Sequence, residues 1–469
     1  MEKILVIDFG SQYTQLIARR LRELSVYSEV CPWDEIPDLS GVKGFILSGG
    51  PESSNIEGNP SIHQQIFDTK KPILGICYGM QVLAHQEEGR IINEGKREFG
   101  YAKIDIKQDS ILFKNLDKSL DVWMSHGDKV ESLPDGYNIT AFSNNSPVAA
   151  YENIAKKYFG LQFHPEVTHT ESGTTIIKNF LEICDIEQNW SADDILQQIN
   201  ALVKTEVKDG EVLLALSGGV DSTVLAAVLH KTLGNKLTCV MVDHGLLRKD
   251  EALNVVKNLK EKIGLSVNLA NAQDTFLSKL KGITDPEEKR KIIGNTFIEV
   301  FESESKKLND IKWLAQGTIY PDVIESAGNS KTKAKVIKSH HNVGGLPERM
   351  QLKLLEPFRM LFKDEVRKIG RKLGLPSYLI QRHPFPGPGL GVRLLGAIDK
   401  SKLEILREAD AIFMEELIKQ KLYNKISQAY AAFLPVKSVG VVGDCLLYTS
   451  PSPRDQRGSG VPGCGWKKK

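Results

Sequence analysis

The chain has 469 residues, of which 41% are hydrophobic and 26% charged, with 61 basic and 59 acidic side chains and a formal net charge of +2. This length excludes a single ordinary core and favours two or three domains of about 100–200 residues each. The near-neutral charge argues against nucleic acid as a partner, and no apolar run reaches the roughly 20 residues that cross a bilayer, so we expect no membrane association.

Short apolar runs alternate with amphipathic stretches from the N-terminus to about residue 185. Strand-like runs at 4–7, 44–47 and 72–76 stand among helical patterns at 12–24 and 80–87. Buried parallel strands joined by crossover helices have this pattern. We therefore predict an open parallel-sheet α/β domain.

The N-terminus and the cysteines indicate the compartment. The sequence moves from Met1 into a strand-like run without the basic start, apolar middle and small-residue cleavage site of a secretory signal. The cysteines lie far apart and form no C-x-x-C pair, which suits reduced thiols better than disulfides or zinc ligation. We expect a cytoplasmic protein.

Cys77 lies in the sequence GICYG (residues 75–79), after the strand-like run and before a helical pattern. A nucleophile on a tight strand-to-helix turn exposes its sulfur, and the N–H groups at the start of the helix stabilise a thiolate. A small buried structural residue is the plain alternative for any single cysteine. The flanking glycines make room for the turn and favour a nucleophile.

The sequence QFHPE (residues 162–166) offers a base for that thiol. Side chains two residues apart in an extended strand share a face, so Glu166 can hold the imidazole of His164 while the imidazole takes the thiol proton. A structural histidine is the alternative for an isolated His-x-Glu. The sequence SGGP (residues 48–51) follows another strand and offers backbone N–H groups to an oxyanion, although alone it is only a turn.

These stretches, together with DFGSQ at residues 8–12, resemble the class I glutamine amidotransferases. In that family a cysteine attacks the carboxamide of glutamine, a glutamyl thioester forms, ammonia leaves and water releases glutamate. The resemblance implies a catalytic triad of Cys77, His164 and Glu166, with oxyanion N–H groups from Gly50 and Tyr78. It also implies a glutamine pocket lined by Gln81, Ser125, His126 and Asp128.

The periodic pattern lapses near residues 184–190, where we expect a domain boundary, and a second α/β domain follows. Ser191, with an acidic residue three positions on, is an N-cap signal for a helix that we predict to end at about Val207. The next predicted elements are strands at 212–216 and 237–242 and a helix at 222–233.

The sequence SGGVDS (residues 217–222) stands between a predicted strand and a predicted helix, where consecutive N–H groups and the positive end of the helix favour an anion. It lacks the lysine of the G-x-x-x-x-G-K-[S/T] loop, so ordinary γ-phosphate chemistry is not indicated. A plain turn with an N-cap serine is the alternative. The stretch resembles the loop of the N-type ATP pyrophosphatases, which adenylate a carbonyl oxygen. The resemblance implies that ATP is bound by Ser217, Gly218, Gly219, Val220, Asp221 and Ser222.

Five further stretches resemble the GMP synthase family rather than synthetases of NAD, asparagine or argininosuccinate. They are VDHGLLR (242–248), QGTIYPDVIES (316–326), KSHHNVGGL (338–346), FKDEVR (362–367) and RHPFPGPGL (382–390). The resemblance implies that xanthosine monophosphate (XMP) is bound by Arg248 and Asp322, ATP also by Lys363, and Mg²⁺ by Asp221 and Asp364. An arginine suits a 5′-phosphate on physical grounds, whereas a solvated surface position is the alternative for each of these charged residues.

Three regions in the second half lack a regular pattern. The basic stretch 331–345 has the composition of a mobile lid over ATP, or equally of a surface loop. The Pro/Gly cluster 383–391 cannot continue a helix or a central strand, and a charged helix is predicted after it at 400–421. The resemblance ends at about Asp444, and 445–469 has the composition of a disordered tail.

The predicted architecture is α/β, with two consecutive open parallel-sheet domains and a truncated α+β dimerisation domain. The assigned ranges are 1–188 for the amidotransferase domain, 189–383 for the ATP pyrophosphatase domain, 384–444 for the partial dimerisation domain and 445–469 for the tail. The resemblance implies a homodimer, and we expect the dimerisation surface of this chain to be incomplete.

The predicted function is glutamine-dependent synthesis of GMP. ATP adenylates XMP, and ammonia from glutamine displaces AMP, so glutamine, ATP and XMP are the expected partners and Mg²⁺ the expected cofactor. Two alternatives remain open. One is an amidotransferase-coupled ATP pyrophosphatase with a different acceptor, and the other is a chain that retains only glutaminase activity and nucleotide binding.

Overall fold

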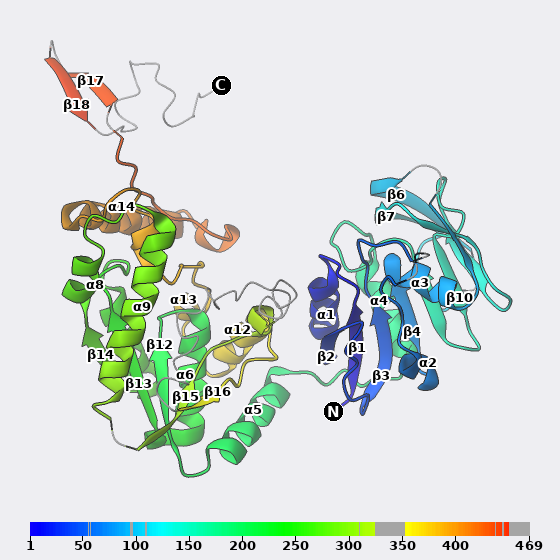
Figure 1. Ribbon diagram of the computed structural model, residues 1–469, viewed down its shortest axis with the longest axis horizontal. Coiled ribbons are helices and arrows are strands. Elements are labelled where there is room, and N and C mark those ends of the chain that lie inside the picture. The colour runs from blue at the N-terminus through cyan, green and yellow to red at the C-terminus, as the bar shows by residue number, and fades with distance from the viewer. Residues whose placement is uncertain are drawn as a thin grey trace. The chain divides into compact units, whose positions relative to one another are not determined.

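The computed structural model describes residues 1–449 except 55, 57, 94–96, 108–109, 309, 324–351, 437 and 443–444, and only the backbone of 438–442 and 445–449. The chain forms two compact units, Met1–Asp194 and Ile195–Lys469 (Figure 1). Within the described ranges, no helix combines the length and the apolar composition that crossing a membrane requires.

The first unit is built on a nine-stranded sheet with the order β2-β1-β3-β4-β11-β10-β9-β6-β7. Neighbours from β2 to β11 run parallel, and the remaining neighbours run antiparallel. The strands are β1 Lys3–Asp8, β2 Ser28–Pro32, β3 Val42–Leu47, β4 Ile73–Ile76, β6 Glu98–Ile106, β7 Ser119–His126, β9 Asn138–Phe142, β10 Ala150–Asn153 and β11 Tyr158–Leu161. A small second sheet pairs β5 (Arg90–Ile92) with β8 (Lys129–Ser132).

The helices of this unit are α1 Thr14–Glu23, α2 Gln64–Asp68, α3 Tyr78–Gln86 and α4 Gly173–Ile183. The parallel part of the sheet and its helices confirm the predicted α/β class. The antiparallel strands were not predicted from the pattern of buried runs, because β6 and β7 alternate between buried and exposed side chains and carry no continuous apolar run.

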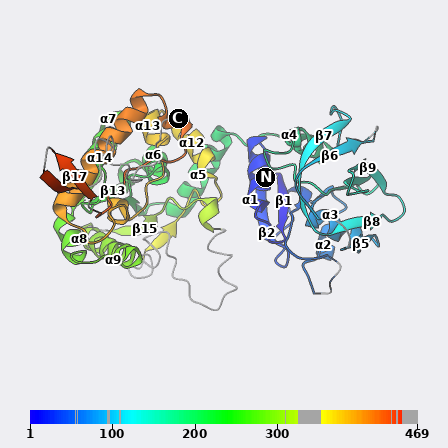
Figure 2. The ribbon, with the colours of Figure 1, turned by 90° about the horizontal axis from the view of Figure 1, so that it is seen from above.

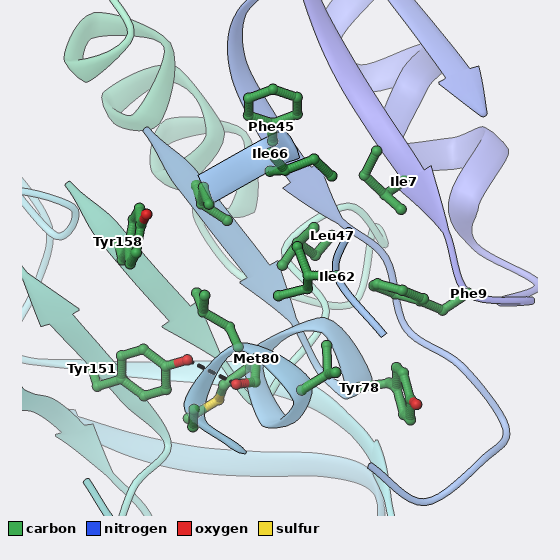
Figure 3. Close-up of a cluster of buried hydrophobic side chains, with 14 of the residues drawn as sticks. Ile7, Phe9, Phe45, Leu47, Ile62, Ile66, Tyr78, Met80, Tyr151 and Tyr158 are labelled. Carbon is green, nitrogen blue, oxygen red and sulfur yellow. Dashed lines mark hydrogen bonds between the residues drawn. The ribbon is translucent and has the colours of Figure 1, made fainter. Parts of the chain in front are cut away.

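One face of the parallel strands packs against α2 and α3 (Figure 3). Phe45 and Leu47 of β3 meet Ile66 of α2 and Met80 of α3 in this core, and all four are buried. The hydroxyl of Tyr151 donates a hydrogen bond of 2.7 Å to the carbonyl oxygen of Met80, so burial of this polar group leaves it satisfied. The core therefore fixes α3, and with it the turn that precedes the helix, against the sheet.

The second unit is built on a five-stranded, fully parallel sheet with the order β14-β13-β12-β15-β16. The strands are β12 Glu211–Leu216, β13 Leu237–Asp243, β14 Val267–Asn271, β15 Ile311–Ala315 and β16 Lys353–Leu355. The helices are α5 Ala192–Val207, α6 Val220–Leu233, α7 Glu251–Ile263, α8 Gln273–Lys279, α9 Pro286–Ser305, α12 Lys363–Lys372, α13 Ser377–Ile380 and α14 Lys400–Lys419. Short 3₁₀ helices are η1 Gly234–Lys236, η3 Gly389–Val392 and η4 Tyr423–Lys425. Figure 2 shows β13 and β15 between α6 and α9.

The predicted helix after Ser191 is confirmed as α5, and its cap has the expected form. The N–H of Asp194 donates to the Oγ of Ser191 at 3.3 Å, and the N–H of Ser191 donates to the carboxylate of Asp194 at 3.2 Å. This reciprocal pair satisfies donors that the first turn of a helix leaves unpaired.

The segment after the Pro/Gly cluster packs on the second unit. Leu390, Leu394 and Leu403 lie in the same buried cluster as Leu213 of β12 and Phe301 of α9. The domain boundary predicted near residue 384 remains a proposal.

The first five residues of the stretch predicted as a disordered tail have an extended backbone. Cys445–Thr449 form strand β18, which pairs antiparallel with β17 (Ser438–Val442). Leucine, tyrosine and threonine in this stretch favour the extended backbone, a preference that the turn-type composition of the whole tail concealed. Residues 450–469 lie outside the described residues.

Candidate active sites

Cys77 lies at the turn between β4 and α3, in an unusual backbone conformation. It is the N-cap of α3, with φ of 53° and ψ of −107°, and its side chain is buried. A Cβ on Gly79 would lie 2.3 Å from the carbonyl oxygen of Leu47, and one on Gly75 would lie 2.5 Å from that of Gly79. The glycines on both sides are therefore required by close backbone contacts, and the predicted elbow is present.

His164 and Glu166 form a buried pair beside this cysteine. The Nδ1 atom of His164 lies 2.7 Å from Oε1 of Glu166, and both side chains are almost completely buried. Burial alone would lower the pKa of His164, but the charge of Glu166 and a hydrogen bond with Cys77 raise that pKa well above its usual value. With Nδ1 held by Glu166, Nε2 is the ring atom that can exchange a proton with Cys77.

Residues outside the sequence motifs hold the pair in place. The ring of Tyr13 meets that of His164 edge-on at 5.0 Å, and Nε of Arg20 donates to the backbone oxygen of Glu166 at 2.9 Å. Thr170 donates its hydroxyl to the backbone oxygen of His164 at 2.6 Å. These residues were missed because the contacts join segments that are distant in sequence.

A cavity of about 370 Å³ opens beside Cys77. All six residues expected to form the oxyanion and glutamine site border it: Gly50, Tyr78, Gln81, Ser125, His126 and Asp128. Ser125 also accepts a hydrogen bond from the sulfur of Cys77 through its backbone oxygen, at 3.4 Å. The residues that sequence reasoning missed here are Pro51, Glu52, Ser53, Asn93, Arg97, Phe99 and Gly127. Pro51 belongs to the stretch 48–51, and Gly127 lies between His126 and Asp128. The other five residues lie outside the stretches that carried the resemblance.

The side chain of Tyr78 points away from this chemistry. Its hydroxyl donates to the backbone oxygen of Pro60 at 2.6 Å, and burial raises the pKa of Tyr78 to about 12. Its backbone N–H is different, because Tyr78 is the first residue of α3 and the first N–H groups of a helix have no intrahelical acceptor. The backbone of Tyr78 is therefore the part that can serve an anion.

The other cysteines whose side chains the structure describes do not suit nucleophilic chemistry. Burial raises the pKa of the thiols of Cys31 and Cys239 to about 12, and it raises that of Cys184 as well. A thiol that stays protonated is a poor nucleophile.

The loop 217–222 connects β12 to α6 as predicted. Gly218 has φ of 74°, and Gly219 is the N-cap of α6. The hydroxyls of Ser217 and Ser222 lie 3.0 Å apart, and Ser222 donates to the backbone oxygen of Gly219 at 3.2 Å. The loop is thus closed on itself by its serines, with the N-terminal end of α6 beneath it.

A second cavity, of about 360 Å³, opens at this loop. All six loop residues and Lys363 border it, together with Arg382, His244, Phe297, the stretch Gln316–Thr318 and the stretch His383–Gly387. Nζ of Lys363 lies 3.2 Å from Oδ2 of Asp221, while Oδ1 of Asp221 is buried without a hydrogen-bond partner among the described residues. The predicted positive charge and carboxylate are therefore together at the phosphate loop.

Arg382 is a residue of this cavity for which the sequence suggested no role. Its guanidinium donates to the backbone oxygen of Gly218 and forms an ion pair with Glu251. Arg382 begins the stretch 382–390, which the resemblance singled out, and that was the available signal. His244, another residue missed, stays neutral, because burial lowers its pKa to about 4.

Three of the expected nucleotide and metal residues do not border either cavity: Arg248, Asp322 and Asp364. The guanidinium of Arg248 lies 3.0 Å from Asp410 and 4.9 Å from the ring centre of Phe385, which does border the second cavity. Asp322 accepts a hydrogen bond from the N–H of Ile319 at 2.9 Å.

Asp364 is the second residue of α12, directly after Lys363. Among the described side chains, no group of three or more metal-ligating residues gathers at one point. The expected lid at 331–345 lies outside the described residues.

Comparisons with known proteins agree with this division. The family model for class-I glutamine amidotransferases matches residues 5–184, and that for the PP-loop domain matches residues 192–291. The GMP synthase [glutamine-hydrolyzing] of Xanthomonas axonopodis pv. citri (strain 306) is 55% identical over 456 residues, which cover 95% of this chain and 88% of that protein. The chain belongs to the GMP synthase family.

A second GMP synthase, from Vibrio vulnificus (strain CMCP6), is 54% identical over 451 residues, covering 95% of this chain and 87% of that protein. A glutamine amidotransferase structure from Thermotoga maritima is 20% identical, covers 42% of this chain and 85% of that one, and has a TM-score of 0.31. Membership of the GMP synthase family confirms the resemblance drawn from the sequence, and with it the expected enzyme class.

Proposed function

We propose that this chain makes GMP from XMP, ATP and glutamine, with AMP, pyrophosphate and glutamate as the other products. The observation that carries the proposal is the presence of two built centres in one member of the GMP synthase family. One is a strained cysteine with a buried His–Glu pair at an amino-acid-sized cavity, and the other is a lysine-free phosphate loop with its own cavity.

In the first centre, Cys77 is the nucleophile and His164 the acid and base. The sulfur of Cys77 attacks the carboxamide carbon of glutamine, and the N–H groups of Gly50 and Tyr78 stabilise the oxyanion. His164, held by Glu166, protonates the departing amine, so ammonia leaves and a glutamyl thioester remains. His164 then takes a proton from water, whose oxygen attacks the thioester and releases glutamate and the thiol.

The cavity beside Cys77 has the charges that an amino acid requires. Asp128 offers a carboxylate for the α-ammonium group of glutamine, and Arg97 offers a guanidinium for its α-carboxylate. Gln81, Ser125 and His126 complete the glutamine site in this proposal. Both charged groups on the α-carbon of the substrate would then be bound, which leaves the carboxamide at the other end for the sulfur.

In the second centre, the loop 217–222 binds the pyrophosphate part of ATP through its N–H groups, and Lys363 adds a positive charge. The oxygen at C2 of XMP attacks the α-phosphorus, and pyrophosphate leaves. Ammonia then attacks C2, and AMP leaves with that oxygen. Activation is needed because the oxygen is otherwise a poor leaving group.

The phosphate loop also suits a magnesium ion. Oδ1 of Asp221 is a buried carboxylate oxygen without a hydrogen-bond partner among the described residues, which is the kind of ligand that Mg²⁺ prefers. We propose that Asp221 holds the ion and that Asp364 assists. When bound, Mg²⁺ supplies positive charge to the phosphates.

For the acceptor, we retain Arg248 and Asp322 as residues that bind XMP. The guanidinium of Arg248 lies near Phe385 at the edge of the ATP cavity, a position that suits a neighbouring nucleotide. We further propose a cytoplasmic location, which the free and buried state of Cys31, Cys77, Cys184 and Cys239 supports, and a homodimer.

The test is to measure XMP-dependent AMP formation by the chain as written, first with free ammonia and then with glutamine. We expect activity with both nitrogen donors, and Cys77→Ala as the matched control should lose the glutamine-dependent activity and keep the ammonia-dependent one. Pyrophosphate release with a non-purine acceptor alone would refute the choice of XMP. Glutamine hydrolysis without any AMP formation would refute the synthetase half.

A further inference from the structure

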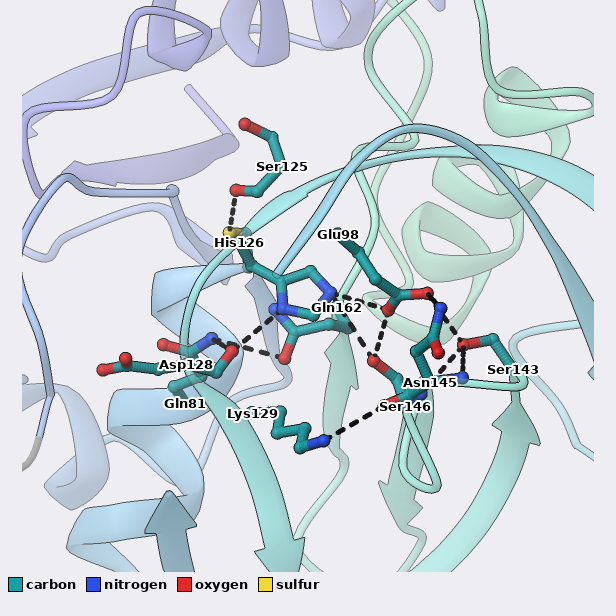
Figure 4. Close-up of polar contacts among 11 residues, drawn as sticks. Gln81, Glu98, Ser125, His126, Asp128, Lys129, Ser143, Asn145, Ser146 and Gln162 are labelled. Carbon is teal, nitrogen blue, oxygen red and sulfur yellow. Dashed lines mark hydrogen bonds and ion pairs between the residues drawn. The ribbon is translucent and has the colours of Figure 1, made fainter. Parts of the chain in front are cut away.

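A second buried histidine–carboxylate pair lies beside the first cavity, formed by His126 and Glu98 (Figure 4). Glu98 is the first residue of β6, and it faces His126 at the end of β7 in the register of the two antiparallel strands. Oε2 of Glu98 lies 3.1 Å from Nε2 of His126. The catalytic step proposed above does not use this pair.

A turn at residues 143–146 surrounds the carboxylate of Glu98 with donors. Ser146 donates to Oε2 at 2.6 Å, and Asn145 and Ser143 donate to Oε1 at 3.2 and 3.3 Å. Lys129 supports the turn from outside by donating to the backbone oxygen of Asn145 at 3.3 Å. A buried carboxylate with this many partners is fixed in position.

The hydrogen bonds of His126 determine its proton count. Nδ1 lies 3.0 Å from the backbone oxygen of Asp128, and a carbonyl oxygen only accepts, so Nδ1 carries a proton. A second proton must then lie between Nε2 and Oε2 of Glu98, because two lone pairs 3.1 Å apart would repel each other. Histidine and carboxyl together are therefore neutral, and the proton lies between them. Burial lowers the pKa of His126, and the charge of Glu98 opposes this effect only in part.

The chain of contacts ends at Asp128, whose backbone oxygen has two donors. One is Nδ1 of His126, and the other is Nε2 of Gln81 at 2.7 Å. Gln81 belongs to α3, and its N–H donates to the backbone oxygen of Cys77 at 3.2 Å. The backbone at Asp128 is thus tied on one side to the helix of the nucleophile and on the other to Glu98.

The side chain of Asp128 borders the cavity together with Cys77. Its carboxylate accepts a hydrogen bond from the hydroxyl of Ser53, and it has no ion pair among the described residues. A carboxylate without a cation at an amino-acid-sized cavity is suited to an ammonium group of a ligand.

We propose that Glu98 is a positioning residue for glutamine. Through His126 it fixes the backbone of Asp128, so that the carboxylate of Asp128 stands where it receives the α-ammonium group of the substrate. This inference rests on the proposed glutaminase function. Since the α-ammonium group is remote from the carboxamide that reacts, loss of Glu98 should raise KM for glutamine and change kcat little.

The neutral pair predicts an unusual order among substitutions. In Glu98→Gln the side-chain amide can donate to Nε2 of a neutral His126, whose Nδ1 proton still reaches Asp128. In Glu98→Asp the charge remains, but the shorter side chain withdraws from the ring. We therefore expect Gln to preserve KM within about three-fold, and Ala and Asp to raise it about ten-fold to a hundred-fold, the range for lost buried hydrogen bonds.

The matched control is Glu152→Ala. Glu152 is another buried carboxylate of this unit, bonded to the hydroxyl of Ser110 at 2.8 Å, and it does not border the cavity. This variant should keep the parent KM. Thermal unfolding of each variant reports whether it folds, and Glu98→Asp keeps the question answerable if Glu98→Ala is unstable.

The deciding measurement compares two reagents for Cys77. One is iodoacetamide, which has no α-ammonium group, and the other is a glutamine analogue with an electrophilic carbon in place of the carboxamide. In Glu98→Ala and Glu98→Asp, the analogue should react about ten-fold or more slowly, and iodoacetamide within about two-fold of the parent rate.

Equal slowing with both reagents would overturn the inference, because it would place the damage at the triad. An unchanged KM in Glu98→Ala, a Gln variant no better than Asp, or a Glu152→Ala variant as impaired as Glu98→Ala would also overturn it. Failure of the analogue to label the parent chain would instead refute the proposed glutaminase function.

Discussion

The backbone of Cys77 permits a direct measurement of the strain in the elbow. With φ of 53° and ψ of −107°, this residue lies outside the regions that L-amino acids prefer. Such a residue costs about 1–3 kcal/mol when the surrounding structure holds it in place. Cys77→Ala and Cys77→Gly both remove the sulfur and its contact with His164, so they differ only by one methyl group and by the strain that the methyl carries.

The expected order of stability is the reverse of the usual one. Glycine is ordinarily about 0.5–1 kcal/mol less stable than alanine within regular structure, because the unfolded chain gains freedom. Taking the middle of each range, relief of about 2 kcal/mol of strain outweighs a cost of about 0.75 kcal/mol. The free energy of unfolding of Cys77→Gly should therefore exceed that of Cys77→Ala by about 1 kcal/mol. For a unit of this size each kcal/mol corresponds to about 2–4 °C in Tm.

The assay is calorimetric unfolding of the full chain, with tryptophan fluorescence to assign the transition. The first unit contains Trp33, Trp123 and Trp190, which report on its unfolding. Both variants should lack glutaminase activity, so the comparison is one of stability alone. A Cys77→Ala variant as stable as Cys77→Gly, or more stable, would refute the idea that the elbow stores strain at the nucleophile.

Three further predictions concern the two centres. Glu166→Gln should lower kcat for glutamine hydrolysis by about 10²–10⁴, because the triad loses the anion that orients the imidazole of His164 and stabilises its protonated form. Ammonia-dependent AMP formation should be unchanged, and equal loss of both activities would contradict this. Burial lowers the pKa of His244 to about 4, so the stability that the neutral imidazole contributes is complete above pH 6.5 and is lost as the pH falls toward 4. Between pH 7 and pH 4.5, the free energy of unfolding in urea should therefore fall about 2–3 kcal/mol less in His244→Asn than in the parent, and parallel pH profiles would count against this. Lys363→Met leaves the carboxylate of Asp221 without its cation. We expect it to raise KM for ATP about ten-fold or more, measured as ammonia-dependent pyrophosphate release, and an unchanged KM would remove Lys363 from the ATP site.

The parts of the fold that were predicted from sequence are those determined by neighbouring residues. The elbow at Cys77 and the loop 217–222 each follow a buried strand and open a helix, and both were placed correctly for that reason. The capping pair of Ser191 and Asp194 is equally local. Periodicity and capping describe such segments because the relevant contacts lie within a few residues.

The parts that were missed depend on contacts between distant segments. Glu98 meets His126, which borders the first cavity, because β6 pairs with β7 in one register, and no local pattern specifies that pairing. Arg382 lies 164 positions after Gly218, whose backbone it contacts. In each case the chemistry of the residue was visible, but its neighbours were not.

The two centres use the same local element, a strand–loop–helix turn, in different ways. They differ in which residue of the turn has a positive φ. Both are strand–loop–helix turns at the carboxyl end of a parallel strand, where N–H groups at the start of a helix face a cavity. In the first, the residue with positive φ is Cys77 itself, because the turn must deliver a side chain to the cavity. In the second it is Gly218, because the phosphate that we propose for this turn would approach the backbone N–H groups too closely for a side chain. A nucleophile tolerates strain that the surrounding packing maintains, whereas a phosphate loop has to avoid it, so cysteine and glycine occupy the corresponding positions.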